Sequence, residues 1–138
     1  MKIHTTNHKN TFIEVADDCP VRAGETPAAK ENSKTIAHMQ FEMISKNLYK
    51  FTSDDILFFV FADRTNLKKG EYKKAREQFF SKGQPCLRAS PLTKRYGWGI
   101  HFDKQGLVAL VGCETAEYKK LYNDSTITKV KAMSSKKL

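Results

Sequence analysis

A β-hairpin in the last third of the chain is the feature that most restricts its fold. Apolar and polar residues alternate over residues 96–102 and again over residues 107–112. The tetrapeptide Asp-Lys-Gln-Gly at 103–106 lies between the two runs and has the residue types that turns favour. The sequence therefore predicts two adjacent antiparallel strands, and with them a sheet that is antiparallel or mixed.

The first strand of this hairpin has two unlike faces. Its larger apolar residues share one face: Trp98, Ile100 and Phe102. The opposite face carries Gly97, Gly99 and His101. We expect the apolar face to lie in the core. The glycines leave the backbone uncovered, so a neighbour can approach closely there. That neighbour is either a packed helix or strand, which the pattern slightly favours, or a bound ligand.

Three further segments are candidates for strands. Residues 11–16 alternate between apolar and polar side chains, which predicts a strand. Residues 56–64 are apolar on both faces, and this pattern is typical of a strand buried on both sides at the centre of a sheet. Residues 127–133 fit a strand and a helix equally well.

Helices are predicted over three segments. Residues 35–47 carry apolar side chains at helical spacing, with Ser33 placed to cap the helix. Residues 67–82 form the second predicted helix and residues 115–123 a short third one. Residues 17–33 and 84–95 read as loops, because each segment contains two prolines.

These elements place the chain in the α+β class. The predicted order is β-α-β-α-β-β-α, in a mixed or antiparallel sheet with the helices largely on one face. The length of 138 residues suits one domain, which we expect to span residues 1–133. Residues 134–138 are expected to be a frayed, basic C-terminal tail.

Positive charge is concentrated rather than spread along the chain. The formal net charge is +9, and residues 82–104 and 125–138 contribute +4 each. Clustered positive charge attracts anions. Within the first cluster, Arg88, Lys94, Arg95 and His101 accompany Gly97 and Gly99. Guanidinium groups bind phosphate and carboxylate with paired hydrogen bonds, so these six residues predict a binding site for a small anionic ligand.

Several alternatives remain open. The run Arg95-Tyr96-Gly97-Trp98 interleaves basic and aromatic residues, as weak nucleic-acid binders do. A small enzyme is a second alternative, using Cys86 or His101, although free cysteines are far more often buried and inert. In the third, the flat glycine face forms a homodimer surface. No metal site and no cofactor are expected, since the chain has no C-x-x-C pair, P-loop or G-x-G-x-x-G motif.

The cysteine content indicates a reducing compartment. The three cysteines are odd in number and widely spaced, unlike the paired cysteines of secreted domains. The first ten residues are polar and do not resemble a signal peptide. The longest apolar run has seven residues, against the roughly 20 that a membrane span needs. We therefore expect a cytoplasmic protein without a membrane segment.

The sequence also resembles a known family. The runs NTFIEVADDCPV, YKFTSDDILFFV and, above all, FFSKGQPCLRASPLTKRYGWGIHFD are similar to the mainly bacterial domain-of-unknown-function family numbered 6157. The likeness extends over nearly the whole chain. It implies a single domain, and it transfers no activity.

Overall fold

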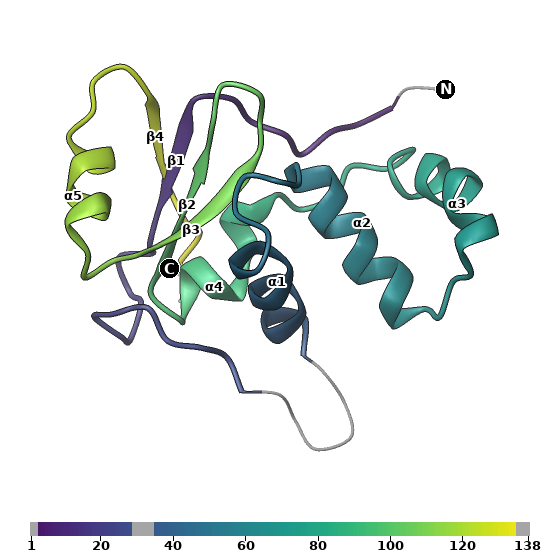
Figure 1. Cartoon of the computed structure of the whole chain (residues 1–138), viewed down its shortest axis with the longest axis horizontal. Helices are drawn as coiled ribbons and strands as arrows, with labels where there is room; N and C mark the ends of the chain where they lie inside the picture. The colour runs from purple at the N-terminus through teal and green to yellow at the C-terminus, as the bar shows by residue number, and fades with distance from the viewer. Residues whose placement is uncertain (1–2, 29–34, 135–138) are drawn as a thin grey trace.

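A four-stranded mixed sheet forms the centre of the protein (Figure 1). The computed structural model describes residues 3–28 and 35–134. The strand order is β3-β2-β1-β4, with bounds Thr11–Glu14 for β1, Trp98–Phe102 for β2, Val108–Gly112 for β3 and Thr128–Lys131 for β4. The β1–β2 and β2–β3 pairs are antiparallel, and β1 and β4 are parallel. The α+β class and the mixed sheet are therefore confirmed.

The predicted hairpin is β2 and β3. Phe102 pairs with Val108 next to the turn, and Trp98 pairs with Gly112 at the far end. The carboxylate of Asp103 accepts hydrogen bonds from the backbone of Gln105 and Leu107, both at 2.9 Å. These bonds satisfy backbone groups that the turn leaves unpaired, which is why aspartate suits this position.

The segment 56–64 is a helix, and its prediction as a central strand is wrong. It forms most of α2, Ser53–Arg64. The side chain of Thr52 accepts a hydrogen bond from the backbone of Asp55, and the Asp55 carboxylate accepts one from the backbone of Thr52. This capping box starts a helix. A helix buried on most sides is apolar all round, so its sequence shows no helical stripe.

Three further helices lie within the predicted helical segments: α1 (Ile36–Ser45), α3 (Tyr72–Phe79) and α5 (Ala116–Tyr122), with a short 3-10 turn at Lys69–Glu71 before α3. The prediction of a loop over residues 84–95 is wrong in part, because this segment contains a 3-10 turn at Leu87–Ala89 and the short helix α4 (Pro91–Lys94), whose first residue is a proline as helix starts favour. The N-cap of α1 is Thr35, and the predicted cap Ser33 lies outside the described residues. The ambiguous segment 127–133 contains strand β4. Of the predicted tail, residues 135–138 also lie outside the described residues.

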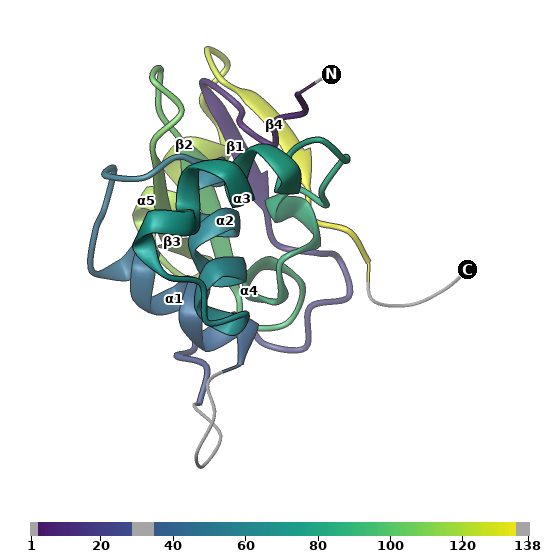
Figure 2. The same cartoon turned by 90° about the vertical axis from the view of Figure 1, so that its right-hand side faces the viewer.

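The helices form layers on the two faces of the sheet (Figure 2). On one face, α1, α2 and α4 bury side chains such as Ile44, Ile56 and Leu92 against Ile13 and Ile100 of the sheet. The helix α3 packs outside α2 through a separate cluster around Phe58 and Phe80. On the opposite face, α5 covers Phe12 and Val111. Among the helices of the described residues, none combines the length and apolar character that crossing a membrane requires.

Candidate functional site

Protein side chains occupy the space beside Gly99. A Cβ atom built on Gly99 would lie 2.7 Å from Cζ of Phe12 and 2.8 Å from Cε2 of Tyr118, which belongs to α5. At Gly97 the backbone has a φ of +78°, and a Cβ there would lie 2.4 Å from the carbonyl oxygen of Ala23. The close approach that these glycines permit is therefore made by a helix, a neighbouring strand and a loop of the protein itself.

His101 lies among acidic residues rather than among the predicted cations. Its Nδ1 is 2.8 Å from the phenol oxygen of Tyr49. Burial lowers the pKa of His101 below its ordinary value of 6.5, and the negative charges of Asp103, Glu117 and Asp124 partly oppose that shift. The negative charges of these carboxylates repel an anionic ligand from the neighbourhood of His101. Within the described part of the chain, no hydrogen bond, ion pair or ring contact joins His101 to Arg88, Lys94 or Arg95.

The lowered pKa of His101 gives a pH prediction. Protonating this imidazole costs more in the folded chain than in the unfolded chain, so the folded state loses stability as the pH falls below about 6.5. The loss levels off below the folded-state pKa. A proton–carbon NMR titration of the imidazoles, with His101→Gln to assign the signal, should give a midpoint below 6.5. A midpoint at or above that value would mean that the three carboxylates outweigh burial.

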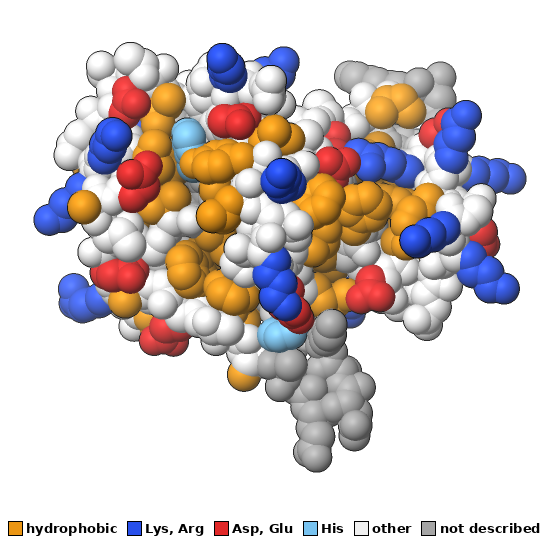
Figure 3. Space-filling model, viewed as in Figure 1, with side chains coloured by type: hydrophobic (Ala, Val, Ile, Leu, Met, Phe, Trp, Pro, Cys, Tyr) orange, Lys and Arg blue, Asp and Glu red, His pale blue; other side chains and the backbone are white. Residues whose placement is uncertain are grey.

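The predicted cations serve partly as internal contacts. The Nε of Arg88 donates to the carbonyl oxygen of Lys131 at 2.7 Å, which fastens the 3-10 turn at Leu87–Ala89 to the end of β4. Lys131 itself forms an ion pair with Asp17. Lys94 ends α4, and Arg95 is exposed. On the face in Figure 3, most Lys and Arg side chains lie around the margin, others lie near the centre, and apolar side chains gather between them.

Trp98 packs inward, as its place on the apolar face predicted. Its ring lies against Phe41 of α1, with centroids 5.5 Å apart, and its Nε1 donates to the carbonyl oxygen of Glu25 at 2.8 Å. The indole is therefore engaged within the protein through both its ring and its N–H group.

A groove of about 700 Å³ lies between α1, α2, α3 and residues 84–91. Its walls are mainly apolar, and its described lining residues are Ile36, Gln40, Leu57, Val60, Phe61, Arg64, Thr65, Phe79, Gln84, Pro85, Cys86, Ala89, Ser90 and Pro91. Arg64 is the one charged side chain among them. Cys86, which the sequence singled out as a reactive candidate, lies in this wall. The size falls within the range of small-molecule sites.

Two hydrogen bonds fix the segment that forms one wall of the groove. The hydroxyl of Ser90 donates to the amide oxygen of Gln40 at 2.6 Å, and both side chains are buried. The amide of Gln84 donates to the carbonyl of Phe79 at 2.7 Å. Ser90 also caps α4 by accepting from the backbone of Leu92, with proline in the first turn as helix starts favour. The side chains of Gln40, Gln84 and Ser90 are therefore bonded within the protein, and the lining of the groove is mainly apolar.

Arg64 is the charged residue among those that line the groove. It is the last residue of α2, it is exposed, and it forms no ion pair with another described residue. The sequence did not mark it as a candidate, because it was assigned to the end of a buried strand. The signal that the sequence did offer was the position of Arg64, a cation at the end of a long apolar run. Together with Phe61, it borders the groove only because residues 53–64 form a helix.

A second hollow of about 760 Å³ lies between residues 3–5 and α3. Its lining mixes both signs of charge, with Lys73 and Lys74 beside Glu77. Two more of its charged residues are already bonded within the protein, since Asp54 accepts from Thr5 and Arg76 pairs with Asp55 at 2.9 Å. Charges of both signs therefore line this hollow, and neither sign predominates clearly enough to select a charged ligand. Within the described residues, no three His, Cys, Asp or Glu side chains gather as a metal site requires.

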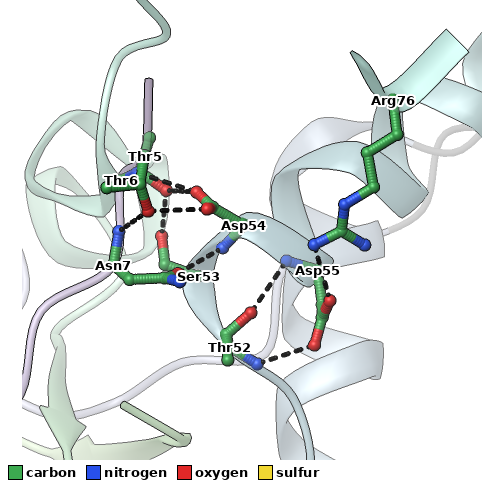
Figure 4. Close-up of polar contacts among 8 residues, drawn as sticks. All are labelled: Thr5, Thr6, Asn7, Thr52, Ser53, Asp54, Asp55 and Arg76. Carbon is green, nitrogen blue, oxygen red and sulfur yellow. Dashed lines mark hydrogen bonds and ion pairs between the residues drawn. The ribbon is translucent and has the colours of Figure 1, made fainter. Parts of the chain in front are cut away.

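The N-terminal segment is fastened to the start of α2 by a buried carboxylate (Figure 4). Asp54 accepts hydrogen bonds from the hydroxyl of Thr5 at 2.6 Å and from both the backbone and the hydroxyl of Thr6 at 2.7 Å. In return, Asn7 accepts from the backbone of Asp54 at 2.9 Å. The hydrogen bonds of this cluster are all made between residues of the protein, so we assign the cluster a role in stabilising the fold.

Comparison with known proteins identifies the family. Residues 3–138 match the model of a family described as a family of unknown function (DUF6157). The match covers nearly the whole chain, so the protein belongs to this family, as the sequence resemblance indicated. A search of curated proteins and a search of solved structures gave no match. The description of the family names no activity, and function has to be argued from the geometry.

Proposed function

We propose that the protein binds a small molecule with an apolar body and one carboxylate or phosphate group, in the groove between α1, α2, α3 and residues 84–91. The observation that carries this proposal is the combination of an apolar lining with a single charged residue, Arg64, that has no ion-pair partner among the described residues. The predicted class of ligand is thus kept, and its place is moved from His101 to this groove.

The chemistry of the groove suits such an amphipathic anion. Burying an apolar body against Leu57, Phe61 and Phe79 gains roughly 25 cal/mol for each Å² removed from water. A guanidinium group holds a carboxylate or phosphate with paired hydrogen bonds that fix the orientation of the ligand. The satisfied pair of Gln40 and Ser90 adds no competing charge. The three free thiols favour a reducing compartment, and we place this activity in the cytoplasm.

Removing the charge of Arg64 tests the proposal. Decanoate should raise the melting temperature of the protein and bind measurably in calorimetry, whereas methyl decanoate, which lacks the charge, should bind far more weakly. Arg64→Gln should weaken decanoate binding about tenfold to a hundredfold, the value of one charge-assisted interaction. Phenyl phosphate in the same assay asks whether phosphate is preferred to carboxylate.

Arg95→Gln is the matched control, because Arg95 is an exposed arginine that does not line the groove. It should leave decanoate binding unchanged. If Arg95→Gln abolished anion binding while Arg64→Gln did not, the site would lie where the sequence first placed it. Absence of binding by both decanoate and phenyl phosphate would also contradict the proposal. Weak nucleic-acid binding, catalysis by Cys86 or His101, and homodimer formation stay predictions.

A further inference from the structure

Two of the three cysteines share one small hollow. Cys19 and Cys113 both line a space of about 440 Å³, at the end of β3 and beside the loop that follows β1. Its other described lining residues are Val15, Ala16, Asp17, Pro20, Val21, Arg22 and Tyr118. Both cysteines are free thiols and partly exposed. The third, Cys86, lies in the wall of the binding groove instead. The fold has thus brought together two thiols that are far apart in sequence.

The loop that carries Cys19 is fastened on both sides of Cys113. The backbone of Gly24 donates to the carboxylate of Glu114 at 3.0 Å, directly after Cys113. The backbone of Cys113 donates to the carbonyl oxygen of Gly97 at 3.0 Å, and Gly97 is in close contact with Ala23 of the same loop. These contacts hold the loop over the end of β3, so that the two thiols stay on one side of it.

Electrostatics agree with this proximity. Burial raises the pKa of Cys113, and the negative charge that Cys19 carries as a thiolate raises it further. Such an influence weakens with distance, so it agrees with the placement of both thiols at one hollow. The raised pKa favours the neutral thiol of Cys113 at rest.

We propose that Cys19 and Cys113 are a site of reversible oxidation, at which hydrogen peroxide converts the two thiols into an intramolecular disulfide. One sulfur, as its thiolate, attacks a peroxide oxygen and becomes a sulfenic acid, while the O–O bond breaks and the other oxygen leaves as hydroxide, which takes up a proton to give water. The second thiolate attacks that sulfur, and the sulfenic oxygen leaves as a second water. Hydrogen peroxide thus takes two electrons and two protons from the thiols. Glutathione or another thiol restores the reduced pair by exchange.

Mass spectrometry of the native protein tests this site. After brief treatment with dilute hydrogen peroxide and quenching, the intact chain should lose about 2 Da, the mass of two hydrogens. Thiols that react with an alkylating reagent should fall from three to one, with Cys86 the one left. Digestion without reductant should release a linked peptide that contains Cys19 and Cys113, and dithiothreitol should abolish it.

Single cysteine variants separate this site from general oxidation. Cys86→Ser should still form the link in full, whereas Cys113→Ser should form none and should accumulate sulfenic or sulfinic acid at Cys19. Because the linked peptide is sought in the unmodified chain, the result does not depend on how well the variants fold. Sulfinic acid on all three cysteines, a link that involves Cys86, or disulfides only between two chains would each overturn the proposal.

Discussion

Replacing Asp54 by alanine is expected to lower the free energy of unfolding by about 3 kcal/mol. The carboxylate is 8% exposed and accepts three hydrogen bonds, from the hydroxyl of Thr5 and from the backbone and hydroxyl of Thr6. Alanine leaves the buried backbone N–H of Thr6 without an acceptor, and a buried unpaired donor costs about 1–3 kcal/mol. The hydroxyls of Thr5 and Thr6 also lose their bonds to the carboxylate, although the Thr6 hydroxyl can still bond to Ser53, 2.7 Å away. It also removes a negative charge from the first turn of α2, where the helix dipole favours one.

Urea denaturation followed by circular dichroism measures this change. Asp63→Ala is the matched control, since Asp63 is an exposed aspartate near the other end of α2. It should change the free energy of unfolding by no more than about 0.5 kcal/mol. Asp54→Asn should fall between the two, because the amide keeps one acceptor and loses the charge. An Asp54→Ala protein as stable as the Asp63→Ala protein would show that residues 5–7 are not fastened to α2 in solution.

Gly97→Ala is expected to destabilise the protein by a similar amount, about 3 kcal/mol. The backbone of Gly97 has a φ of +78°, a left-handed conformation that costs a residue with a Cβ about 1–2 kcal/mol. The new methyl would also lie 2.4 Å from the carbonyl oxygen of Ala23, which is rigid backbone rather than the end of a flexible side chain. Relief of that contact requires the loop to move, which would strain the hydrogen bond from Gly24 to Glu114.

Gly70→Ala is the control for this second substitution. Gly70 lies in the exposed 3-10 turn before α3, and no other atom lies within 4 Å of the position that its Cβ would take. The substitution should be neutral or stabilise slightly, because alanine restricts the unfolded chain. Both variants are compared by thermal denaturation at one protein concentration. If Gly97→Ala melted together with Gly70→Ala, residues 21–25 would not pack on the hairpin as described.

The hairpin shows where local reasoning succeeds. Its strands are separated by a short turn, their alternation has the period of a strand, and Asp103 satisfies the turn from within. The same holds for α1, whose apolar spacing is helical and whose buried face includes Ala37 and Ile44. In each case the residues that decide the structure are near neighbours in the sequence, so the pattern can be recognised without knowledge of the rest of the fold.

The segment 56–64 shows where local reasoning fails. Packing α2 among other helices and the sheet gives an apolar residue at nearly every position, and this removes the periodicity that distinguishes a helix from a buried strand. The capping box of Thr52 and Asp55 was visible in the sequence as a run of turn-forming residues. These residues indicate the start of a helix only if the apolar run that follows them is interpreted as a helix.

Which of the candidate residues lie together could not be read from the sequence, for a related reason. Residues grouped by nearness in sequence, such as Arg88 and His101, take up contacts with β4 and with Tyr49 respectively. Of the candidates, only Cys86 lies in the proposed groove. Arg64, which we propose as the anion contact, faces residues 84–91 because α2 and the segment before α4 pack against a common core.

The hairpin that restricts the fold was therefore determined by the sequence itself. The same is true of the amphipathic helix α1 and of the placement of the excess positive charge along the chain. Each of these features depends on residues that are close together in the sequence. The tertiary structure alone decided that residues 53–64 are a helix, that β4 lies parallel to β1, and that the glycine face is filled by Phe12 and Tyr118. It also decided which residues border the groove and which two cysteines line one hollow. These outcomes depend on contacts between segments that are distant in the sequence. The packing that stabilises such contacts leaves no pattern within any one segment, so the sequence of that segment does not reveal it.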